Sequence, residues 1–192
     1  MTEFHWVRHG PTHQKTFVGW RDVPADLSDT AQIARLTSFL PSDAIVVSSD
    51  LIRASATADA IQAHRTRLPS DTKLREFHFG DWDGRHFSDV AETDPTLSRQ
   101  YWETPGDIAP PGGESWNAAA QRISAAVDAL CAHHPGAKII AVAHIGVILT
   151  QVQRALKQDA QQVIAQKIDN LSVTELTLRD GHWTLGAINH LP

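Results

Sequence analysis

Short apolar runs alternate with helical patterns along the chain. Three runs, residues 3–7, 44–48 and 138–143, have mostly apolar residues at consecutive positions, which is typical of buried strands. We predict a strand from each of these runs, and a further strand over residues 72–76, just before a loop rich in Gly, Asp and Trp. Near the C-terminus, residues 172–178 and 182–188 alternate between apolar and polar positions on either side of Asp180-Gly181. An Asp-Gly pair between two such segments predicts a hairpin.

Apolar residues at helical spacing predict helices between these strands. The first helix opens at residues 27–29 with Ser28 as its N-cap, and Ser49-Asp50 caps a second one from Leu51 to about His64. Two more are predicted from residue 114 to 130 and from 146 to 156. From 87 to 113 the pattern is weak, and the Pro- and Gly-rich end of this stretch predicts a long, stiff loop that is a candidate lid.

The order of strand and helix predicts the fold class. Buried strands that alternate with helices indicate an α/β sandwich around a mostly parallel sheet, with a hairpin or edge strand near the end. The sequence shows no repeat, linker or low-complexity segment. We therefore predict one domain over residues 1–192.

Composition and charge narrow the class of function. The chain is 42% hydrophobic and 20% charged, which is ordinary for a globular protein. A net charge of -5 argues against nucleic acid as a partner but leaves room for a small phosphorylated one. The single cysteine, Cys131, cannot form an intrachain disulfide. The chain shows neither a signal-peptide pattern nor an apolar run long enough for a membrane span, so we expect a cytoplasmic protein without membrane contact.

Candidate chemistry gathers where the predicted strands end. Arg8-His9 follows the first strand, Arg53 lies in the first turn of the helix after the second, Glu76 ends the third, and His144 ends the fourth. Ligands of open α/β sheets bind at the carboxyl ends of the strands. We therefore expect two imidazoles, two guanidinium groups and one carboxyl group in one crevice.

This set of groups suits phosphoryl transfer. Arginine binds phosphate oxygens in a bidentate manner and stays charged, and a helix N-terminus adds N–H donors. A neutral imidazole can attack phosphorus without a metal or cofactor when cationic groups hold the phosphate. Glu76, if burial keeps it protonated, can supply the proton that the leaving alkoxide needs and can later activate water.

Each residue also has a structural explanation when it is taken alone. Arg53 would then pair with an acidic neighbour such as Asp50, Glu76 would be a cap or an ion-pair partner, and His144 a core histidine bonded to backbone. A metal centre is the other alternative for a chain with 11 histidines, but no His-Glu-x-x-His or paired-cysteine spacing occurs. The joint placement at four predicted strand ends favours a phosphate site.

Five motifs in order resemble those of the histidine phosphatase superfamily, the phosphoglycerate-mutase-like proteins. The resemblance covers nearly the whole chain and has the pattern of the branch whose acid lies near Glu76, because Ile145 rather than Asp follows the second histidine. The motifs are Arg8-His9-Gly10 with Gly19-Trp20, the segment 48–54, the segment 74–84, Pro111-Gly112-Gly113-Glu114-Ser115, and Ala143-His144-Ile145-Gly146.

The resemblance implies a three-layer α/β/α fold and a phosphohistidine mechanism. Carried over to this chain, it makes His9 the nucleophile and Glu76 the proton donor. The substrate-binding residues that it implies are Arg8, His9, Lys15, Gly19, Arg53 and His144. The chain departs from the pattern at several positions, which are Pro11-Thr12 in place of Glu-Thr or Glu-Ser, Lys15 in place of Asn, Asp83 in place of Glu, and Ile145 in place of Gly.

Among the activities of such proteins, a phosphatase of a small phosphorylated metabolite fits this chain best. The chain is compact and lacks the longer insertions and tail of the mutases, and it looks most similar to α-ribazole phosphatase-like and broad-specificity phosphatases. The alternatives are a phosphoglycerate-type mutase and a non-catalytic phosphate-binding module. The oligomeric state is left open, and a homodimer is compatible with the sequence.

Overall fold

Six strands form one sheet in the computed structural model, which describes residues 1–192. Their order across the sheet is β3-β2-β4-β1-β5-β6. Strands β1 to β4 are parallel, whereas β5 and β6 run antiparallel to their neighbours. The strands are β1 Thr2–Arg8, β2 Ile45–Ser48, β3 Thr66–Arg67, β4 Lys138–Ala143, β5 Val173–Arg179 and β6 His182–Leu185. The prediction of a mostly parallel sheet is confirmed.

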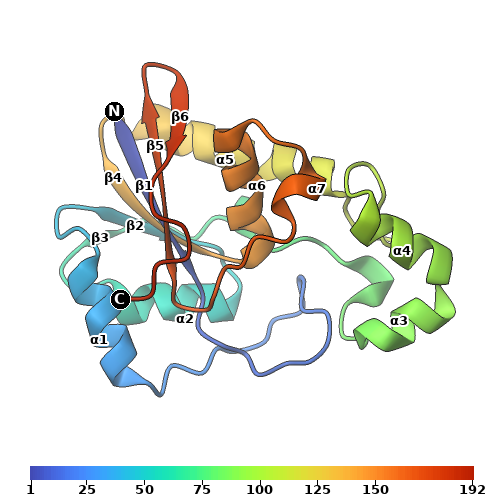
Figure 1. The fold of residues 1–192 in the computed structure, drawn as a ribbon. Coiled ribbons are helices and arrows are strands. Elements are labelled where there is room, and N and C mark those ends of the chain that lie inside the picture. Colours follow the sequence, from blue (N-terminus) through green and yellow to red (C-terminus); the bar gives the residue numbers. More distant parts are fainter.

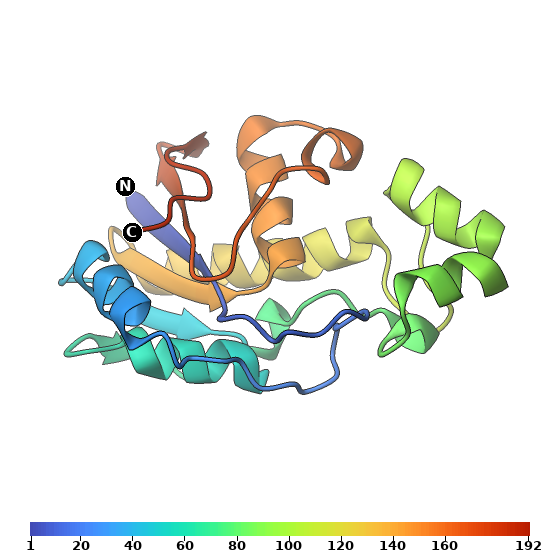
Figure 2. The ribbon, with the colours of Figure 1, turned by 60° about the horizontal axis from the view of Figure 1, so that its bottom comes forward.

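Helices cover both faces of the sheet (Figure 1). One face carries α1 and α2, and the other carries α5 and α6. The helices are α1 Thr30–Phe39, α2 Ile52–Ile61, α3 Phe87–Thr93, α4 Pro95–Glu103, α5 Trp116–His133, α6 Ile145–Leu156 and α7 Ala160–Val163. None of them is long and apolar enough to cross a bilayer. Figure 2 shows the layers from another side, and the predicted three-layer sandwich is confirmed.

Strand β4 explains why a continuous apolar run is needed at the centre of the sheet. Ile139 and Ala141 point into the core under α5 and α6, while Ile140 and Val142 point into the core under α1 and α2. All four are fully buried. Since β4 has a strand on each side and a helical layer on each face, no side chain of its central part can be polar without a partner.

The helix starts differ from the predicted ones by one residue or so. Asp29, not Ser28, caps α1, because its carboxylate accepts a hydrogen bond from the Gln32 N–H at 2.9 Å. Helix α2 begins at Ile52 without a side-chain cap. Asp50 instead forms a bidentate pair with Arg75, with 2.8 Å between Oδ1 and Nε. Asp50 therefore does not pair with Arg53, as the structural explanation of Arg53 had required.

The predicted strand over residues 72–76 is wrong. Residues Thr72–Leu74 form a single 3₁₀ turn, η1, and the strand that follows α2 is the two-residue β3. The Asp71 carboxylate accepts the Lys73 N–H at 2.8 Å and so starts the turn. The turn buries Leu74 against α5. Glu76 consequently reaches its position from a loop and not from the end of a strand.

Two helices occupy the first part of the stretch from residue 87 to 113, in which the hydrophobic pattern is weak. Helices α3 and α4 lie to one side of the sheet (Figures 1 and 2). Their inner side chains, among them Val90 and Tyr101, form a small core with Phe17 and Trp82. Pro95 stands at the first position of α4, where its missing N–H costs nothing. The irregular stretch thus begins only after Glu103.

Candidate active site

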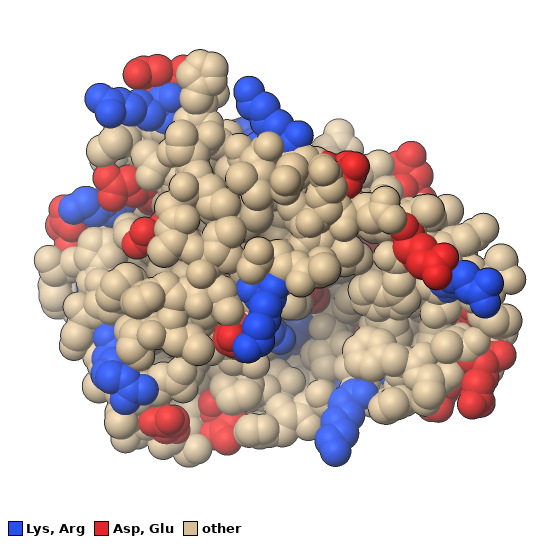
Figure 3. Space-filling model, in the orientation of Figure 1, with Lys and Arg blue, Asp and Glu red and all other residues tan.

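A cavity of about 280 Å³ opens at the carboxyl ends of the parallel strands. Figure 3 shows a hollow in this face of the molecule, with Lys and Arg side chains in it and at its rim. Phe87 and Trp102 contribute aromatic side chains from α3 and α4. The polar residues that line the cavity include Arg8, His9, Arg53, Glu76, Thr12 and Gln14.

The ring of His9 is buried directly after β1 and has a defined tautomer. Its Nδ1 lies 2.7 Å from the carbonyl oxygen of Gly10. A carbonyl oxygen can only accept, so Nδ1 carries the proton and the lone pair of Nε2 is free. Burial, together with the charges of Arg53 and Arg8, lowers the pKa of His9 to about 3. The imidazole is therefore neutral at physiological pH and able to act as a nucleophile.

Arg53 is held in place by the loop that precedes it in the sequence. The guanidinium donates to the carbonyl oxygen of Gly19 at 2.6 Å and to that of Arg21 at 3.0 Å. Its side chain is almost fully buried, and burial lowers its pKa from a very high ordinary value. A buried guanidinium next to an imidazole and bonded only to backbone lacks a counter-ion, and a phosphate dianion would supply one.

Arg8 supplies the second positive charge. Its Nη1 donates to the carbonyl oxygen of Ile168 at 2.5 Å, which fixes the side chain. Its Nε is buried and has no hydrogen-bond partner. An unpaired buried N–H costs free energy, so this donor is available for an oxygen of a ligand in the cavity.

His144 lies immediately after β4 with its ring centroid 5.1 Å from that of His9. The residue is fully buried, and neither ring nitrogen has a hydrogen-bond partner. Burial, with the charges of Arg53 and Arg8, holds the pKa of His144 well below its ordinary value. His144 is thus not the core histidine bonded to backbone that we considered as its structural explanation. It stands behind His9 and does not itself line the cavity.

Glu76 is a buried carboxyl group on the far side of the cavity. Its Oε1 accepts the Phe77 N–H at 3.0 Å, and its Oε2 accepts the Gly146 N–H at 3.3 Å. Burial raises its pKa, and this outweighs the two N–H groups and the arginines, which act in the opposite direction. The environment therefore favours a protonated carboxyl group more than water does.

The loop that carries Glu76 is fixed by one arginine of α5. Arg122 donates to the carbonyl oxygens of Lys73, Arg75 and Glu76 at 2.7, 3.0 and 3.3 Å. The Arg122 guanidinium is oriented by a bidentate pair with Glu114 at 2.8 Å. These bonds replace the ladder that a strand would have provided. Sequence reasoning missed Arg122, because a single arginine on a helix face carries no signal.

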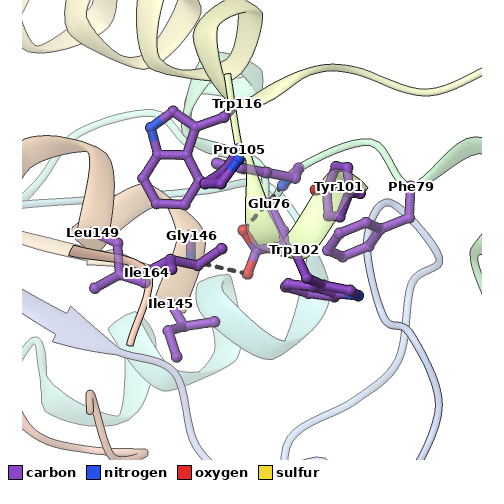
Figure 4. A pocket seen from close by; sticks show the side chains of 11 residues that line it. Glu76, Phe79, Tyr101, Trp102, Pro105, Trp116, Ile145, Gly146, Leu149 and Ile164 are labelled. Carbon is purple, nitrogen blue, oxygen red and sulfur yellow. Dashed lines mark hydrogen bonds between the residues drawn. The ribbon is translucent and has the colours of Figure 1, made fainter. Parts of the chain in front are cut away.

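A second, apolar pocket of about 160 Å³ adjoins the cavity. Glu76, Phe79, Trp102 and Ile145 line both spaces. Figure 4 shows the Glu76 carboxyl group at the centre, with aromatic rings on one side and α6 on the other. Other residues that line this pocket are Tyr101, Pro105, Trp116, Leu149 and Ile164.

Besides His144, two predicted substrate-binding residues, Lys15 and Gly19, do not line the cavity. The side chain of Lys15 is exposed and does not line the cavity, to which its neighbours Gln14 and Thr16 contribute instead. Gly19 acts through its carbonyl group, which accepts from Arg53. A Cβ on Gly19 would lie only 2.6 Å from the carbonyl oxygen of Phe77, so this position has no room for a side chain.

The other histidines are dispersed. His5 on β1 lies 3.5 Å from a carboxylate oxygen of Glu175, and His133 ends α5 with its ring 2.7 Å from the carbonyl oxygen of Ala129. No group of three or more His, Cys, Asp or Glu side chains lies close enough together to hold a metal ion.

Comparison with known proteins connects this geometry to a family. The family model of the histidine phosphatase superfamily (branch 1) matches residues 4–191. Phosphoglycerate mutase-like protein 4 of Arabidopsis thaliana is 33% identical over 96% of this chain and 85% of its own length. A metal-independent phosphoserine phosphatase of the same plant is 29% identical over 100% of this chain and 84% of its own.

The family resemblance also holds in three dimensions. The structure of Bacillus stearothermophilus YhfR superposes with a TM-score of 0.91 and is 25% identical, with 100% of this chain and 98% of that one covered. A bifunctional protein of Mycobacterium tuberculosis is 33% identical over 90% of this chain, which spans only 46% of the length of that relative. The chain belongs to the histidine phosphatase superfamily, branch 1.

Proposed function

We propose that the protein is a phosphatase that hydrolyses a small phosphomonoester through a phosphohistidine intermediate on His9. The observation that carries this proposal is the neutral, buried imidazole of His9, whose free Nε2 shares one cavity with two arginines and a buried carboxyl group. Family membership is consistent with the proposal, since relatives of this chain are named as phosphatases or as mutases.

In the first step the two arginines neutralise the phosphate. The Nε of Arg8 and the free edge of the Arg53 guanidinium donate to its oxygens, while the ring of His144 packs behind the nucleophile with the two ring centroids 5.1 Å apart. The lone pair of His9 Nε2 attacks phosphorus, and the bond between phosphorus and the ester oxygen breaks. Glu76 gives its proton to the departing alkoxide, which leaves as a neutral alcohol.

In the second step water replaces the alcohol. The carboxylate of Glu76 removes a proton from the water, and the oxygen of the water forms a bond to phosphorus. The bond between phosphorus and Nε2 breaks, and inorganic phosphate and the neutral imidazole are regenerated. Glu76 thus ends the cycle protonated, as it began.

A phosphoglycerate-type mutase is the second candidate, favoured by the 33% identity to a mutase-like protein. A mutase must return the phosphoryl group to a second hydroxyl of the same molecule before water reaches it. Interconversion of 2- and 3-phosphoglycerate that is faster than phosphate release would establish this alternative.

The decisive experiment combines turnover with trapping of the intermediate. The purified protein is incubated with p-nitrophenyl phosphate and a metal chelator, and release of nitrophenol and phosphate is followed. A labelled substrate is used to trap a phosphoryl group that is labile to acid and stable to alkali. We expect turnover in the presence of the chelator and label on the wild-type chain.

Two variants assign the label to one residue. His9→Ala is expected to abolish both label and turnover, whereas His133→Ala, which changes an exposed histidine far from the cavity, leaves both intact. Turnover by His9→Ala equal to that of the wild type would contradict the proposal. Binding of phosphate without any turnover would indicate the non-catalytic module.

A further inference from the structure

The apolar pocket lies where the leaving alcohol of the substrate must be. A proton donor has to reach the ester oxygen, so the alcohol departs beside the Glu76 carboxyl group. Attack by His9 is in line, so the alcohol points away from His9. The pocket contains Glu76 but none of His9, Arg8 and Arg53, and it therefore extends from the proton donor in the direction opposite to the nucleophile.

No positive charge is available in this pocket. Its ionisable lining groups are Glu76 and Tyr101, and it contains no lysine, arginine or histidine. The indole N–H of Trp116 already donates to Gln153 at 2.7 Å. In the cavity as a whole the only permanent cations are Arg8 and Arg53, and the transferred phosphate requires both. A carboxylate or second phosphate on the alcohol would lose water here without gaining a partner.

The size of the pocket defines the alcohol further. A cavity of about 150 Å³ with apolar walls is known to hold one benzene ring, and this pocket measures about 160 Å³. Trp102 and Tyr101 form one wall, with ring centroids 5.0 Å apart in an edge-to-face arrangement (Figure 4). Leu149 and Ile164 form the opposite wall. Flat aromatic and branched aliphatic walls favour a ring over a long chain.

We infer that the preferred substrates are phosphomonoesters of uncharged, apolar alcohols with about one ring next to the ester oxygen. This inference rests on the proposed function and specifies its substrate class. Phosphoserine and the phosphoglycerates carry charged groups one or two carbons from the ester oxygen, and they therefore lie outside the preferred class.

The test compares kcat/KM for esters whose leaving alcohols are similarly poor leaving groups. The alcohol part of benzyl phosphate contains an uncharged ring, and that of methyl phosphate contains neither a ring nor a charge. The alcohol parts of phosphoserine and 3-phosphoglycerate are charged. Benzyl phosphate is expected to exceed methyl phosphate by roughly 30-fold, because one buried ring is worth that factor. It is expected to exceed the charged esters by about 100-fold or more.

Two variants tie the preference to the pocket. Trp102→Ala removes one wall and is expected to lower the ratio of benzyl to methyl kcat/KM by roughly 10-fold. Phe39→Ala is the matched control, because Phe39 is 42% exposed where Trp102 is 41% exposed and lies on α1, outside both spaces. Ile164→Lys places a cation at the pocket and is expected to raise kcat/KM for phosphoserine while lowering it for benzyl phosphate. Such a gain cannot result from misfolding.

The outcomes separate the two levels of the proposal. Phosphoserine or 3-phosphoglycerate turned over as fast as benzyl phosphate would overturn the inference and leave the phosphatase standing. Equal effects of Trp102→Ala and Phe39→Ala on the ratio of kcat/KM for benzyl and methyl phosphate would also overturn the inference and leave the phosphatase standing. Absence of turnover and of label on His9 with every ester would overturn the proposed function, and this inference with it.

Discussion

Replacement of Gly146 by alanine would move the Glu76 carboxyl group without changing its chemistry. Gly146 is the second residue of α6, and its N–H donates to Oε2 of Glu76. A Cβ on this residue would lie 2.4 Å from Oε1 of Glu76 and 2.9 Å from Cδ1 of Phe77. Both contacts are shorter than any that a Cβ tolerates, so one of the two side chains must shift.

The size of the shift follows from these distances. Ordinary contact begins at 3.4 Å, and 3.4 minus 2.4 leaves about 1 Å for the carboxyl group to retreat. Phe77 is the less mobile neighbour, because its ring packs edge-to-face on Trp116. A catalytic group displaced by about 1 Å loses on the order of 100-fold in rate. Overpacking lowers the free energy of unfolding by about 1–3 kcal/mol, and the better helix propensity of alanine restores about 1 kcal/mol of it. We therefore expect the variant to fold.

The assay measures kcat for two esters with different leaving groups. Benzyl phosphate needs the proton from Glu76, whereas p-nitrophenol leaves without much help. We expect Gly146→Ala to lose about 100-fold with benzyl phosphate and about 10-fold or less with p-nitrophenyl phosphate. The control is Gly106→Ala, since a Cβ there has its nearest neighbour, Nδ2 of Asn117, at 3.8 Å. Wild-type kcat of Gly146→Ala with benzyl phosphate would refute the assignment of Glu76 as the proton donor at this position.

Three further predictions concern individual groups of the site. Glu76→Gln cannot donate a proton and is expected to slow benzyl phosphate hydrolysis by about 100-fold or more, with a much smaller effect on p-nitrophenyl phosphate; equal effects on the two esters would contradict it. In Arg53→Lys the ammonium group cannot donate to the carbonyl oxygens of Gly19 and Arg21 and to the phosphate at the same time. The KM for p-nitrophenyl phosphate, measured by initial rates, should therefore rise about 10-fold or more. Because burial lowers the pKa of His9 from 6.5 to about 3, the unfolded chain binds the proton first, and the free energy of unfolding should fall as the pH falls from 6.5 towards 3. Urea unfolding at several pH values should show a shallower fall for His9→Ala.

The ends of two strands could be located from the sequence because local patterns define them. Residues 3–7 and 138–143 are apolar runs that stop at a polar residue, and the pairing of β1 with β4 places Arg8 directly opposite Ala143. His9 and His144, which follow these strands, are therefore neighbours by the register of the sheet alone. This part of the site followed from local information.

The position of Glu76 depends on contacts that are distant in sequence. Its loop is held by Arg122, 46 residues further along, and by the indole N–H of Trp20, which donates to the Glu76 carbonyl oxygen at 2.7 Å. Neither contact leaves a trace in the hydrophobic pattern. The prediction of Glu76 at the site therefore came from motif resemblance and from a strand that does not exist.

The α3–α4 segment was missed for a similar reason. Its buried side chains pack on Phe17 and Trp82, not on the sheet, so the apolar residues are too few for a clear helical period. Lys15 was placed in the site by motif position only. The loop from residue 11 to 19 presents Gln14 and Thr16 to the cavity and leaves Lys15 in solvent.

The separate packing of α3 and α4 has an evolutionary consequence. Groups that hold and transfer the phosphate come from the ends of the strands, the adjacent loops and α2. Tyr101 and Trp102, which form one wall of the alcohol pocket, come instead from the α3–α4 segment, which has its own small core. Changes within that segment can alter which alcohol is accepted while the central layers keep their packing. Substitutions within residues 87–103 can therefore adapt the protein to another alcohol while the phosphate-binding groups stay in place.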